Sequence, residues 1–373
     1  MKVGALVHKT MIGLVKENRG PGAVLKEVPV PAVGPDEVLV KVMTSSICGT
    51  DVHIYNWDAW AQKSVTAGYV FGHEFAGIVV EIGSAVTDVS IGDHVSAEGH
   101  MVCGKCRPCR TGNSHVCLNT RSFGITAPGC FAEYALVKAD NVIHNRLDLP
   151  FELACLQDPL GNAVQTVLSG DIVGKSVAVI GAGLIGLMSI AVAKACGASR
   201  VIAVDVNPYR LDMARQMGAD VVIDSSVVKL SEAIRNHTAG EGAEVVLEMS
   251  GHPEAIRESM IAAAHAGRIS LLGIPTREVP LDMGQIIFKG LRLEGITGRR
   301  MYQTWYQLKG LLDSGALHLE RLVTHTFTLD RYEEAFELMR QGRCGKIIFL
   351  HDFVSRGEMG GNASRDVYQE LPL

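Results

Sequence analysis

Four cysteines stand close together at positions 103, 106, 109 and 117 of the 373-residue chain. Their spacing, Cys103-x2-Cys106-x2-Cys109-x7-Cys117, has the sulfur density of a closed tetrahedral zinc site. Four thiolates leave zinc no open position, so such a site stabilises a loop and does no chemistry on a substrate. An iron–sulfur cluster, which also takes four thiolates, and four unliganded buried cysteines are the alternative interpretations.

More scattered residues form a second metal candidate. They are Cys48, His73, Glu74 and Asp158. Each of them alone is more often a packed or hydrogen-bonded core group than a ligand. Together, a thiolate, an imidazole and carboxylates favour a catalytic zinc, which takes about three protein ligands and keeps one position open for water or a substrate oxygen.

A glycine motif supplies the third chemical feature. Gly181, Gly183 and Gly186 form a GxGxxG that follows an apolar strand and opens a helical pattern. In a dinucleotide site the first glycine makes a tight turn, the second lets the backbone approach a pyrophosphate, and the third allows close helix–strand packing. The helix N-terminus then presents free N–H groups to the phosphates.

The nature of the dinucleotide follows from the next strand. Asp205 ends that strand 19 residues after Gly186, where a ribose 2′-hydroxyl needs an acceptor. A carboxylate there repels the 2′-phosphate of NADP, so we predict NAD. Arg210 is able to serve a phosphate, but it is equally placed to flank the adenosine.

Two kinds of region must position these residues. Residues 1 to about 160 carry short apolar runs between glycine and proline turns, which predicts a β-rich region. From Lys175 onward strands and helices alternate, which predicts an α/β fold with a parallel sheet covered on both faces. The predicted strands are 175–183, 200–207, 243–251, 267–275, 291–298 and the start of 324–342, and the predicted helices are 184–198, 208–219, 252–266, 304–315 and the end of 324–342.

Composition excludes several classes of protein. A net charge of −5 argues against a nucleic-acid surface, which needs a clustered basic excess. No apolar run approaches the roughly 18–20 residues of a membrane span, and residues 1–20 lack the features of a secretory signal. Nine cysteines, four of them too tightly spaced for a conventional disulfide framework, favour a reduced, cytoplasmic chain. The polar, glycine-rich segment 355–370 is typical of a mobile tail.

At these motifs the chain resembles the zinc-dependent medium-chain alcohol dehydrogenases over nearly its whole length. CGTDVH and GHE are general to that family, whereas HIYNWD, DPLGNAV and the run containing TGR are more specific to its threonine-oxidising members. The similar stretches are CGTDVHIYNWDAW (48–60), GHEFAG (72–77), EGHMVCGKCRPC (98–109), PGCFAEYA (128–135), DPLGNAV (158–164), DVNPYRLDMAR (205–215) and GITGRRMYQTWY (295–306).

The resemblance implies a GroES-like, β-rich catalytic domain at 1–160 and 302–373 and a Rossmann domain, with a doubly wound parallel sheet that binds NAD, at 161–301. It implies that Cys48, His73 and Glu74 hold the catalytic zinc, with Asp158 as a fourth ligand or an acid beside it. The cofactor contacts it implies, besides the glycine motif, are Ile185, Asp205, Arg210, Leu272, Gly273, Ile274, Ile296 and Thr297.

The reaction implied by the resemblance is oxidation of the secondary alcohol of L-threonine to 2-amino-3-ketobutyrate, in a homotetramer. Thr50 and His53 would relay the proton from the substrate hydroxyl to solvent, because an imidazole titrates in the working range. His100 would approach the substrate. Gln165 stands where we expect a histidine and Arg300 where an acid is common, and both departures concern substrate recognition.

Three rival functions remain at this stage. A polyol or vicinal-diol dehydrogenase, of the sorbitol or butanediol type, shares the zinc site and the NAD fold. A catalytically silent dinucleotide-binding relative would be expected to lack the ligand set at 48, 73, 74 and 158. A zinc-ribbon nucleic-acid binder would need a basic surface, which the net charge of −5 does not suggest.

Overall fold

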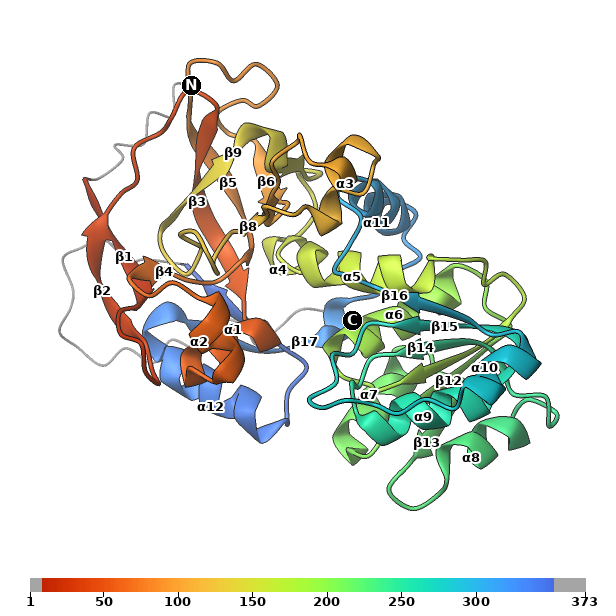
Figure 1. Cartoon of the computed structure of the whole chain (residues 1–373). Helices are drawn as coiled ribbons and strands as arrows, with labels where there is room; N and C mark the ends of the chain where they lie inside the picture. The colour runs from red at the N-terminus through yellow and green to blue at the C-terminus, as the bar shows by residue number, and fades with distance from the viewer. Residues whose placement is uncertain (1–8, 352–373) are drawn as a thin grey trace.

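The chain folds into two lobes, seen in a computed structural model that describes residues 9–351 (Figure 1). One lobe contains the N-terminal strands, drawn red to yellow, together with the last helix and strands, drawn blue. The other, drawn green to cyan, contains the parallel sheet. Among the described residues no helix is both long enough and apolar enough to cross a membrane. The segment 355–370, predicted as a mobile tail, lies outside the described residues.

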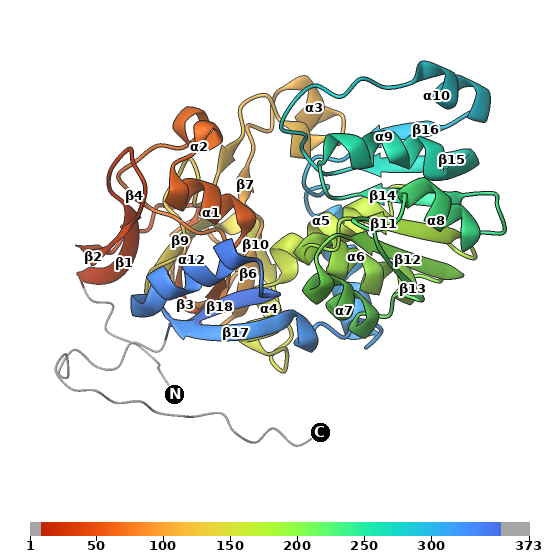
Figure 2. The same ribbon diagram turned by 90° about the horizontal axis from the view of Figure 1, so that it is seen from below.

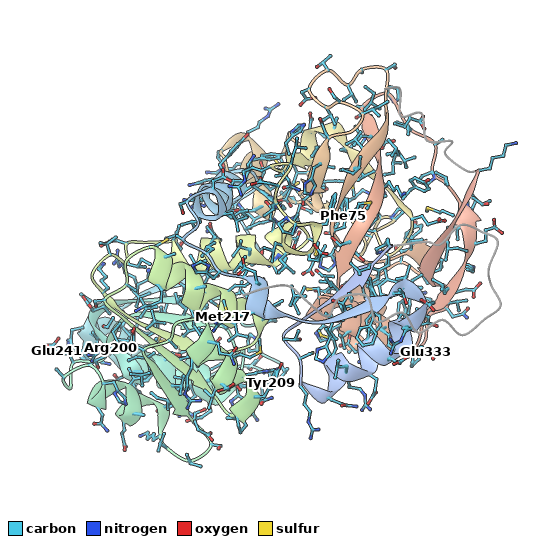
Figure 3. The ribbon with its side chains drawn as sticks, turned by 180° about the vertical axis from the view of Figure 1, so that it is seen from behind. Phe75, Arg200, Tyr209, Met217, Glu241 and Glu333 are labelled. Carbon is cyan, nitrogen blue, oxygen red and sulfur yellow. The ribbon has the colours of Figure 1, made fainter. Side chains whose placement is uncertain are left out.

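The first lobe is built on a seven-stranded sheet with the order β10-β6-β5-β3-β18-β17 and β9 paired with β3. Its central strand β3 is buried on both faces, since the successive residues Val38, Leu39 and Val40 are all completely buried. Phe75, labelled in Figure 3, belongs to the same core. The strands of this sheet are β3 (Glu37–Ser46), β5 (Glu74–Ile82), β6 (His94–Ala97), β9 (Tyr134–Lys138), β10 (Val142–His144), β17 (Val323–Thr328) and β18 (Lys346–Leu350).

Two small sheets and five helices complete this lobe. The small sheets contain β1 (Thr10–Lys16), β2 (Val24–Pro29) and β4 (Tyr69–Val70), and β7 (His100–Met101) and β8 (Arg121–Ser122). The helices are α1 (Gly49–Asn56), α2 (Ala59–Ser64), α3 (Arg107–Arg110), α4 (Phe151–Ala154) and α12 (Tyr332–Gln341). Helix α12 packs on α1, where the rings of Tyr55 and Phe336 stack with centroids 4.4 Å apart.

The chain returns to the first lobe at its C-terminal end. Strand β18 pairs antiparallel with β3 and parallel with β17, so residues from both ends of the described chain share one sheet (Figure 2). This return agrees with a catalytic domain made of two segments. The boundaries 1–160, 161–301 and 302–373 themselves stay a prediction.

The second lobe is a six-stranded, fully parallel sheet with the order β13-β12-β11-β14-β15-β16. Alternate residues of its strands face opposite cores: Val177 and Val179 lie with α6 and α7, whereas Ala178 and Ile180 lie with α8 and α9. The predicted α/β class with a parallel sheet covered on both faces is therefore confirmed. Its strands are β11 (Ser176–Ile180), β12 (Arg200–Asp205), β13 (Val221–Asp224), β14 (Ala243–Glu248), β15 (Ala263–Leu271) and β16 (Arg292–Gly295).

The helices of this lobe are α6 (Leu184–Ala195), α7 (Pro208–Gln216), α8 (Leu230–Asn236), α9 (Pro253–Ala262) and α10 (Met283–Lys289). Two more, α5 (Gln157–Val167) and α11 (Gln303–Asp313), pack against each other where the lobes meet. The helix predicted over 252–266 is too long, because it ends at Ala262 and Ala263 already pairs with Ala243 of β14. Pairing with the sheet overrides the helix propensity of these alanines.

Candidate active site

Three of the predicted metal ligands meet where β3 and β5 lie side by side. Ser46 pairs with Glu74 across these strands, and this register brings Cys48, the N-cap of α1, next to His73 and Glu74. The sulfur of Cys48, a ring nitrogen of His73 and a carboxylate oxygen of Glu74 all lie within 4.8 Å of one another. Side chains 25 residues apart in the sequence thus form one compact group of donors.

Asp51, which is completely buried, holds two of these residues. Its Oδ2 accepts a hydrogen bond from the Cys48 backbone N–H at 2.8 Å, and its Oδ1 lies 3.3 Å from His73 Nδ1. Burial alone lowers the pKa of His73, but Asp51 outweighs it and raises that pKa well above its ordinary value. An imidazole whose Nδ1 faces a carboxylate offers Nε2 to a metal.

Glu74 uses only one of its carboxylate oxygens within the protein. Oε2 accepts hydrogen bonds from Ser46 Oγ at 2.5 Å and from the ammonium of Lys346. Burial lowers the pKa of Lys346, but Glu74 outweighs it and raises that pKa above its ordinary value, which favours the ammonium form of Lys346. Oε1 is buried and has no hydrogen-bond partner in the part of the chain that the structure describes. One thiolate, one imidazole and a carboxylate oxygen free of other partners are the donor set of a zinc site with an open position.

Asp158 does not join this group of donors. It is the second residue of α5, and its Oδ2 accepts a hydrogen bond from Arg299 Nη2 at 2.5 Å. Arg299 is itself 2% exposed and pairs on its other side with Glu98, at 2.8 Å between Nε and Oε2. The structure therefore places Asp158 in a buried ion-pair network, and its predicted role beside the metal stays a prediction.

His100 belongs to the same network through Glu98. Its Nδ1 lies 2.6 Å from Glu98 Oε1, which also accepts the His100 backbone N–H at 2.9 Å. A methyl group added at Gly298 would lie 3.8 Å from His100 Cε1 and 3.9 Å from Asn162 Oδ1. That Asn162 oxygen is buried without a hydrogen-bond partner.

The two residues of the predicted proton relay lie one turn apart on α1. Thr50 Oγ1 lies 3.8 Å from Cys48 Sγ, beside the metal ligands. The side chain of His53 is 57% exposed, and its Nδ1 lies 2.5 Å from Asp58 Oδ2. Thr50 thus lies at the donor group and His53 at the solvent, as a relay between them requires.

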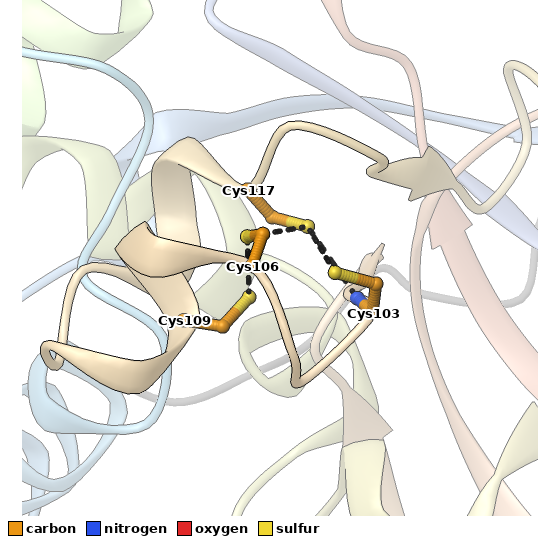
Figure 4. A group of neighbouring side chains, drawn as sticks. All are labelled: Cys103, Cys106, Cys109 and Cys117. Carbon is orange, nitrogen blue, oxygen red and sulfur yellow. Dashed lines mark hydrogen bonds between the residues drawn. The ribbon is translucent and has the colours of Figure 1, made fainter.

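The four clustered cysteines form a separate group of donors around α3 (Figure 4). The sulfur of Cys106 lies 3.4 Å from that of Cys109 and 3.8 Å from that of Cys117, which lies 3.5 Å from Cys103. Backbone N–H groups lower the pKa of Cys103 to about 6, which favours a thiolate. All four ligand atoms lie within 4.8 Å of one another, which fits a closed tetrahedral zinc site.

The glycine motif opens a cavity of about 700 Å³ at the carboxyl ends of the parallel strands. Gly181, Gly183, Asp205 and Arg210 line it. Gly181 has φ +95°, and a Cβ on Gly186 would lie 2.0 Å from the Gly181 carbonyl oxygen, so both positions require glycine.

The other predicted cofactor residues lie around the same edge of the sheet. Ile185 and Gly186 belong to the first turn of α6, Leu272, Gly273 and Ile274 follow β15, and Ile296 and Thr297 follow β16. Because β15 and β16 are parallel neighbours, the last two groups lie side by side. The residues that follow β15 and β16 do not line the 700 Å³ cavity.

Asp205 joins the end of β12 to the glycine turn. Its Oδ2 accepts the Ala182 N–H at 2.8 Å, and its Oδ1 accepts the N–H groups of Val206 and Asn207 at 2.8 and 2.9 Å. Arg210 Nη1 lies 3.8 Å from the same carboxylate. A 2′-phosphate in this position would meet a carboxylate held in place by three backbone groups.

Several residues of the site were not predicted from the sequence. Asp51 could have been predicted, because it belongs to the CGTDVH motif. Arg299 and Lys346 carry no spacing signal, since their carboxylate partners are 141 to 272 residues away in the chain. Asn162 was not selected either, although it belongs to DPLGNAV.

Comparisons with known proteins agree with this geometry. The family model described as "Alcohol dehydrogenase GroES-like domain" matches residues 34–147, and the one described as "Zinc-binding dehydrogenase" matches 185–314. The L-threonine 3-dehydrogenase of Bacillus licheniformis is 52% identical over 91% of this chain and 99% of its own length, and that of Pyrococcus horikoshii is 49% identical over 92% and 99%. The solved structure of 2R,3R-butanediol dehydrogenase from Bacillus subtilis superposes with a TM-score of 0.83 at 26% identity, covering 91% of this chain and 99% of that one.

Both halves of the architecture thus have counterparts in one family. The chain belongs to the zinc-binding alcohol dehydrogenases, enzymes that combine a GroES-like domain with a dinucleotide-binding domain and take zinc and NAD as cofactors.

Proposed function

We propose that this enzyme oxidises the secondary alcohol of L-threonine to 2-amino-3-ketobutyrate, with NAD as the hydride acceptor. The observation that carries the proposal is the group formed by Cys48, His73 and Glu74, in which a buried carboxylate oxygen has no protein partner. Identity of 52% to an L-threonine 3-dehydrogenase, against 26% to a butanediol dehydrogenase, supports threonine over a diol.

Cys48, His73 and Glu74 would hold a zinc ion, which lowers the pKa of an alcohol, while NAD bound at the glycine motif accepts the hydride. The surrounding side chains keep these donors in place: Asp51 orients the imidazole and Lys346 neutralises the carboxylate. Thr50 and His53 would carry the hydroxyl proton from the donor group to solvent.

We further propose that Cys103, Cys106, Cys109 and Cys117 hold a second, structural zinc. Metal analysis tests this assignment together with the first. Two zinc ions per chain are expected, and one would support a catalytically silent relative.

The cell compartment and the assembly belong to the same proposal. We propose a cytoplasmic homotetramer that serves threonine breakdown. All nine cysteines lie in the described residues and none of them forms a disulfide, as expected in a reducing compartment. On α10, which lies at the β16 edge of the sheet, Met283, Ile287 and Phe288 are 59%, 66% and 86% exposed, an apolar row that suits contact with a second copy.

The decisive experiment measures NADH formation with L-threonine, D-threonine, L-serine, sorbitol and 2,3-butanediol. L-threonine should give the highest kcat/KM. Faster turnover of sorbitol or butanediol would reject threonine and establish the polyol or diol reaction. The Cys48→Ser variant serves as the control for activity that does not depend on the metal.

A further inference from the structure

A histidine and an aspartate pair at the C-terminal end of α1, the helix that Cys48 caps. His53 lies in the last turn of this helix, and its Nδ1 lies 2.5 Å from Asp58 Oδ2. Trp57 ends the helix in the left-handed region, with φ +55°, and the Asp58 backbone N–H then donates to the His53 carbonyl oxygen at 3.4 Å. The turn after α1 therefore brings a carboxylate back to the exposed imidazole.

The carboxylate of Asp58 is held by a second helix. Asp58 is the N-cap of α2, and its Oδ1 accepts the backbone N–H groups of Trp60 and Ala61, both at 3.0 Å. The N–H of Ala61, more than the bond to His53, lowers the pKa of Asp58 below its ordinary value. Asp58 is therefore an ionised acceptor, with one oxygen bound to the start of α2 and the other directed at His53.

An ionised carboxylate determines which nitrogen of the imidazole carries the proton. It accepts hydrogen bonds and donates none, so Nδ1 of His53 must be the donor of the pair. A neutral imidazole with its proton on Nδ1 has its lone pair on Nε2. Asp58 thus makes Nε2 the nitrogen of His53 that is able to accept a proton.

The proposed proton relay needs such a nitrogen. Thr50 Oγ1 lies 3.8 Å from Cys48 Sγ, and Thr50 and His53 are three residues apart on one helix. Side chains at this spacing lie on the same face, with Cβ atoms about 5–6 Å apart. A proton that leaves the substrate hydroxyl through Thr50 must meet a lone pair on the imidazole before it passes to water. Nε2 supplies that lone pair only while Nδ1 keeps its proton, which is the state that Asp58 favours.

Stability does not explain why this position carries a carboxylate. Ion pairs between exposed side chains contribute little to folding, because solvent screens them. The cap of α2 needs only one oxygen, and asparagine or serine caps a helix as well as aspartate does. We propose that Asp58 is a positioning residue for the proton relay: it holds His53 in the Nδ1–H tautomer and stabilises the imidazolium that forms when Nε2 takes the proton. This inference rests on the proposed oxidation of an alcohol through Thr50 and His53.

Asp58→Asn changes the tautomer and keeps the helix cap. The asparagine oxygen still accepts from the first N–H groups of α2, so the amide N–H group faces His53 Nδ1 and makes it an acceptor. Nε2 then carries the proton and is unable to take another. With saturating L-threonine, NADH formation in the first turnover should slow by about 10- to 100-fold, part of the roughly 10²- to 10⁴-fold that a positioned base contributes, while KM stays nearly unchanged. An unchanged rate would overturn the proposal.

Two further measurements distinguish a defect in proton transfer from a structural one. In enzyme labelled with ¹⁵N-histidine, the ring signals of His53, assigned through His53→Gln, should report Nδ1–H in the wild type and Nε2–H in Asp58→Asn. Because His53 is exposed, a base dissolved in the buffer can take over the transfer. The rate of Asp58→Asn should therefore rise with HEPES concentration at constant pH and ionic strength. A variant that stays slow at every concentration would contradict a role of Asp58 in the relay.

Asp93→Asn is the matched control. Asp93 Oδ2 lies 3.0 Å from Nε2 of His144 and accepts the Ser90 backbone N–H at 2.8 Å, so it too is a partly exposed carboxylate that joins a histidine to a backbone turn. This pair belongs to β10 and to the turn before β6, and not to α1. Because the substitution removes the same charge away from the relay, the first-turnover rate should not change. A fall equal to that of Asp58→Asn would attribute both effects to lost surface charge and reject the proposal.

Failure of the proposed function gives a different result. If the wild-type enzyme does not oxidise L-threonine, that substrate is wrong, and the rates are compared with the tested alcohol that is oxidised fastest. The ¹⁵N measurement needs no substrate. Nε2–H at His53 in the wild type would reject the role of Asp58 whatever the alcohol is, and a change from Nδ1–H to Nε2–H in Asp58→Asn would support it.

Discussion

Lys346→Met should destabilise the enzyme in a way that depends on the catalytic metal. The Lys346 ammonium is buried against Glu74 and donates a further hydrogen bond to the Ile47 carbonyl oxygen at 2.9 Å. Removing one member of a buried ion pair costs about 3–5 kcal/mol, because it leaves the other charge without compensation. Ser46 still donates to Glu74 at 2.5 Å, so we expect a loss of about 3 kcal/mol in protein without zinc.

Zinc bound to the free oxygen of Glu74 would supply a second positive charge. In zinc-loaded protein the loss should therefore fall to about 1 kcal/mol, the cost of the unsatisfied Ile47 carbonyl. Urea unfolding of wild type and variant, each with and without the catalytic zinc, measures both values. Equal losses in the two states would refute the idea that Lys346 and the metal share the charge of Glu74.

Lys16→Met provides the matched control. Lys16 is also buried, but its ammonium donates to the carbonyl oxygens of Gly22 at 2.7 Å and Tyr55 at 3.2 Å and has no carboxylate partner within residues 9–351. Its loss leaves no buried charge behind. The destabilisation should be the same with and without zinc, and a zinc-dependent loss here would point to a general effect of the metal on the fold.

Three further outcomes are expected. Cys48→Ser should abolish NADH formation and lower the zinc content by one ion per chain while NAD still binds by fluorescence titration, and wild-type-like turnover without zinc would contradict the catalytic assignment. Asp205→Ser should raise kcat/KM with NADP relative to NAD by about tenfold, because it removes the charge that repels the 2′-phosphate; an unchanged ratio means that Asp205 does not select the cofactor. Burial lowers the pKa of His351 to about 3, so below about pH 6.5 the unfolded chain binds a proton that the folded chain does not, and stability should fall by up to about 1.4 kcal/mol per pH unit on acidification. His351→Gln should flatten this fall in urea unfolding at about pH 7 and about pH 5, and an identical pH dependence would exclude His351 as its source.

Local patterns predicted the α/β class of the second lobe and five of its six strands, but neither β13 nor α8. A buried parallel strand reads as a continuous apolar run, and β11, β12 and β14 were recognisable for that reason. The boundary of α9 was wrong because pairing with β14, a contact outside the segment, decided where the helix ends. Weakly patterned elements such as α10, on which Met283, Ile287 and Phe288 are exposed, were not predicted at all.

For the catalytic group too, the sequence indicated the residue types and the tertiary structure decided which residues meet. Cys48, His73 and Glu74 were selected because their types suit zinc and because the chain resembles a family, but 25 residues of sequence separate the thiol from the imidazole. The pairing of β3 with β5 brings them within 4.8 Å of one another. Asp158 was selected on the same grounds, and the fold pairs it with Arg299 outside this group.

By itself the sequence determined which chemistry this protein carries: four thiolates at the spacing of a closed zinc site, a glycine turn with an acid one strand later, and a sparser set of soft and hard metal donors. Short spacing encodes the four thiolates, and the order of strand, glycine turn, helix and strand encodes the acid at Asp205. The sparser donors were selected by side-chain type and by the resemblance to a family. Only the tertiary structure decided which donors meet, that Lys346 neutralises Glu74, and that Arg299 pairs with both Glu98 and Asp158. Those contacts depend on strand register and on the packing of two lobes, and interactions over such distances leave no local signal in a single chain.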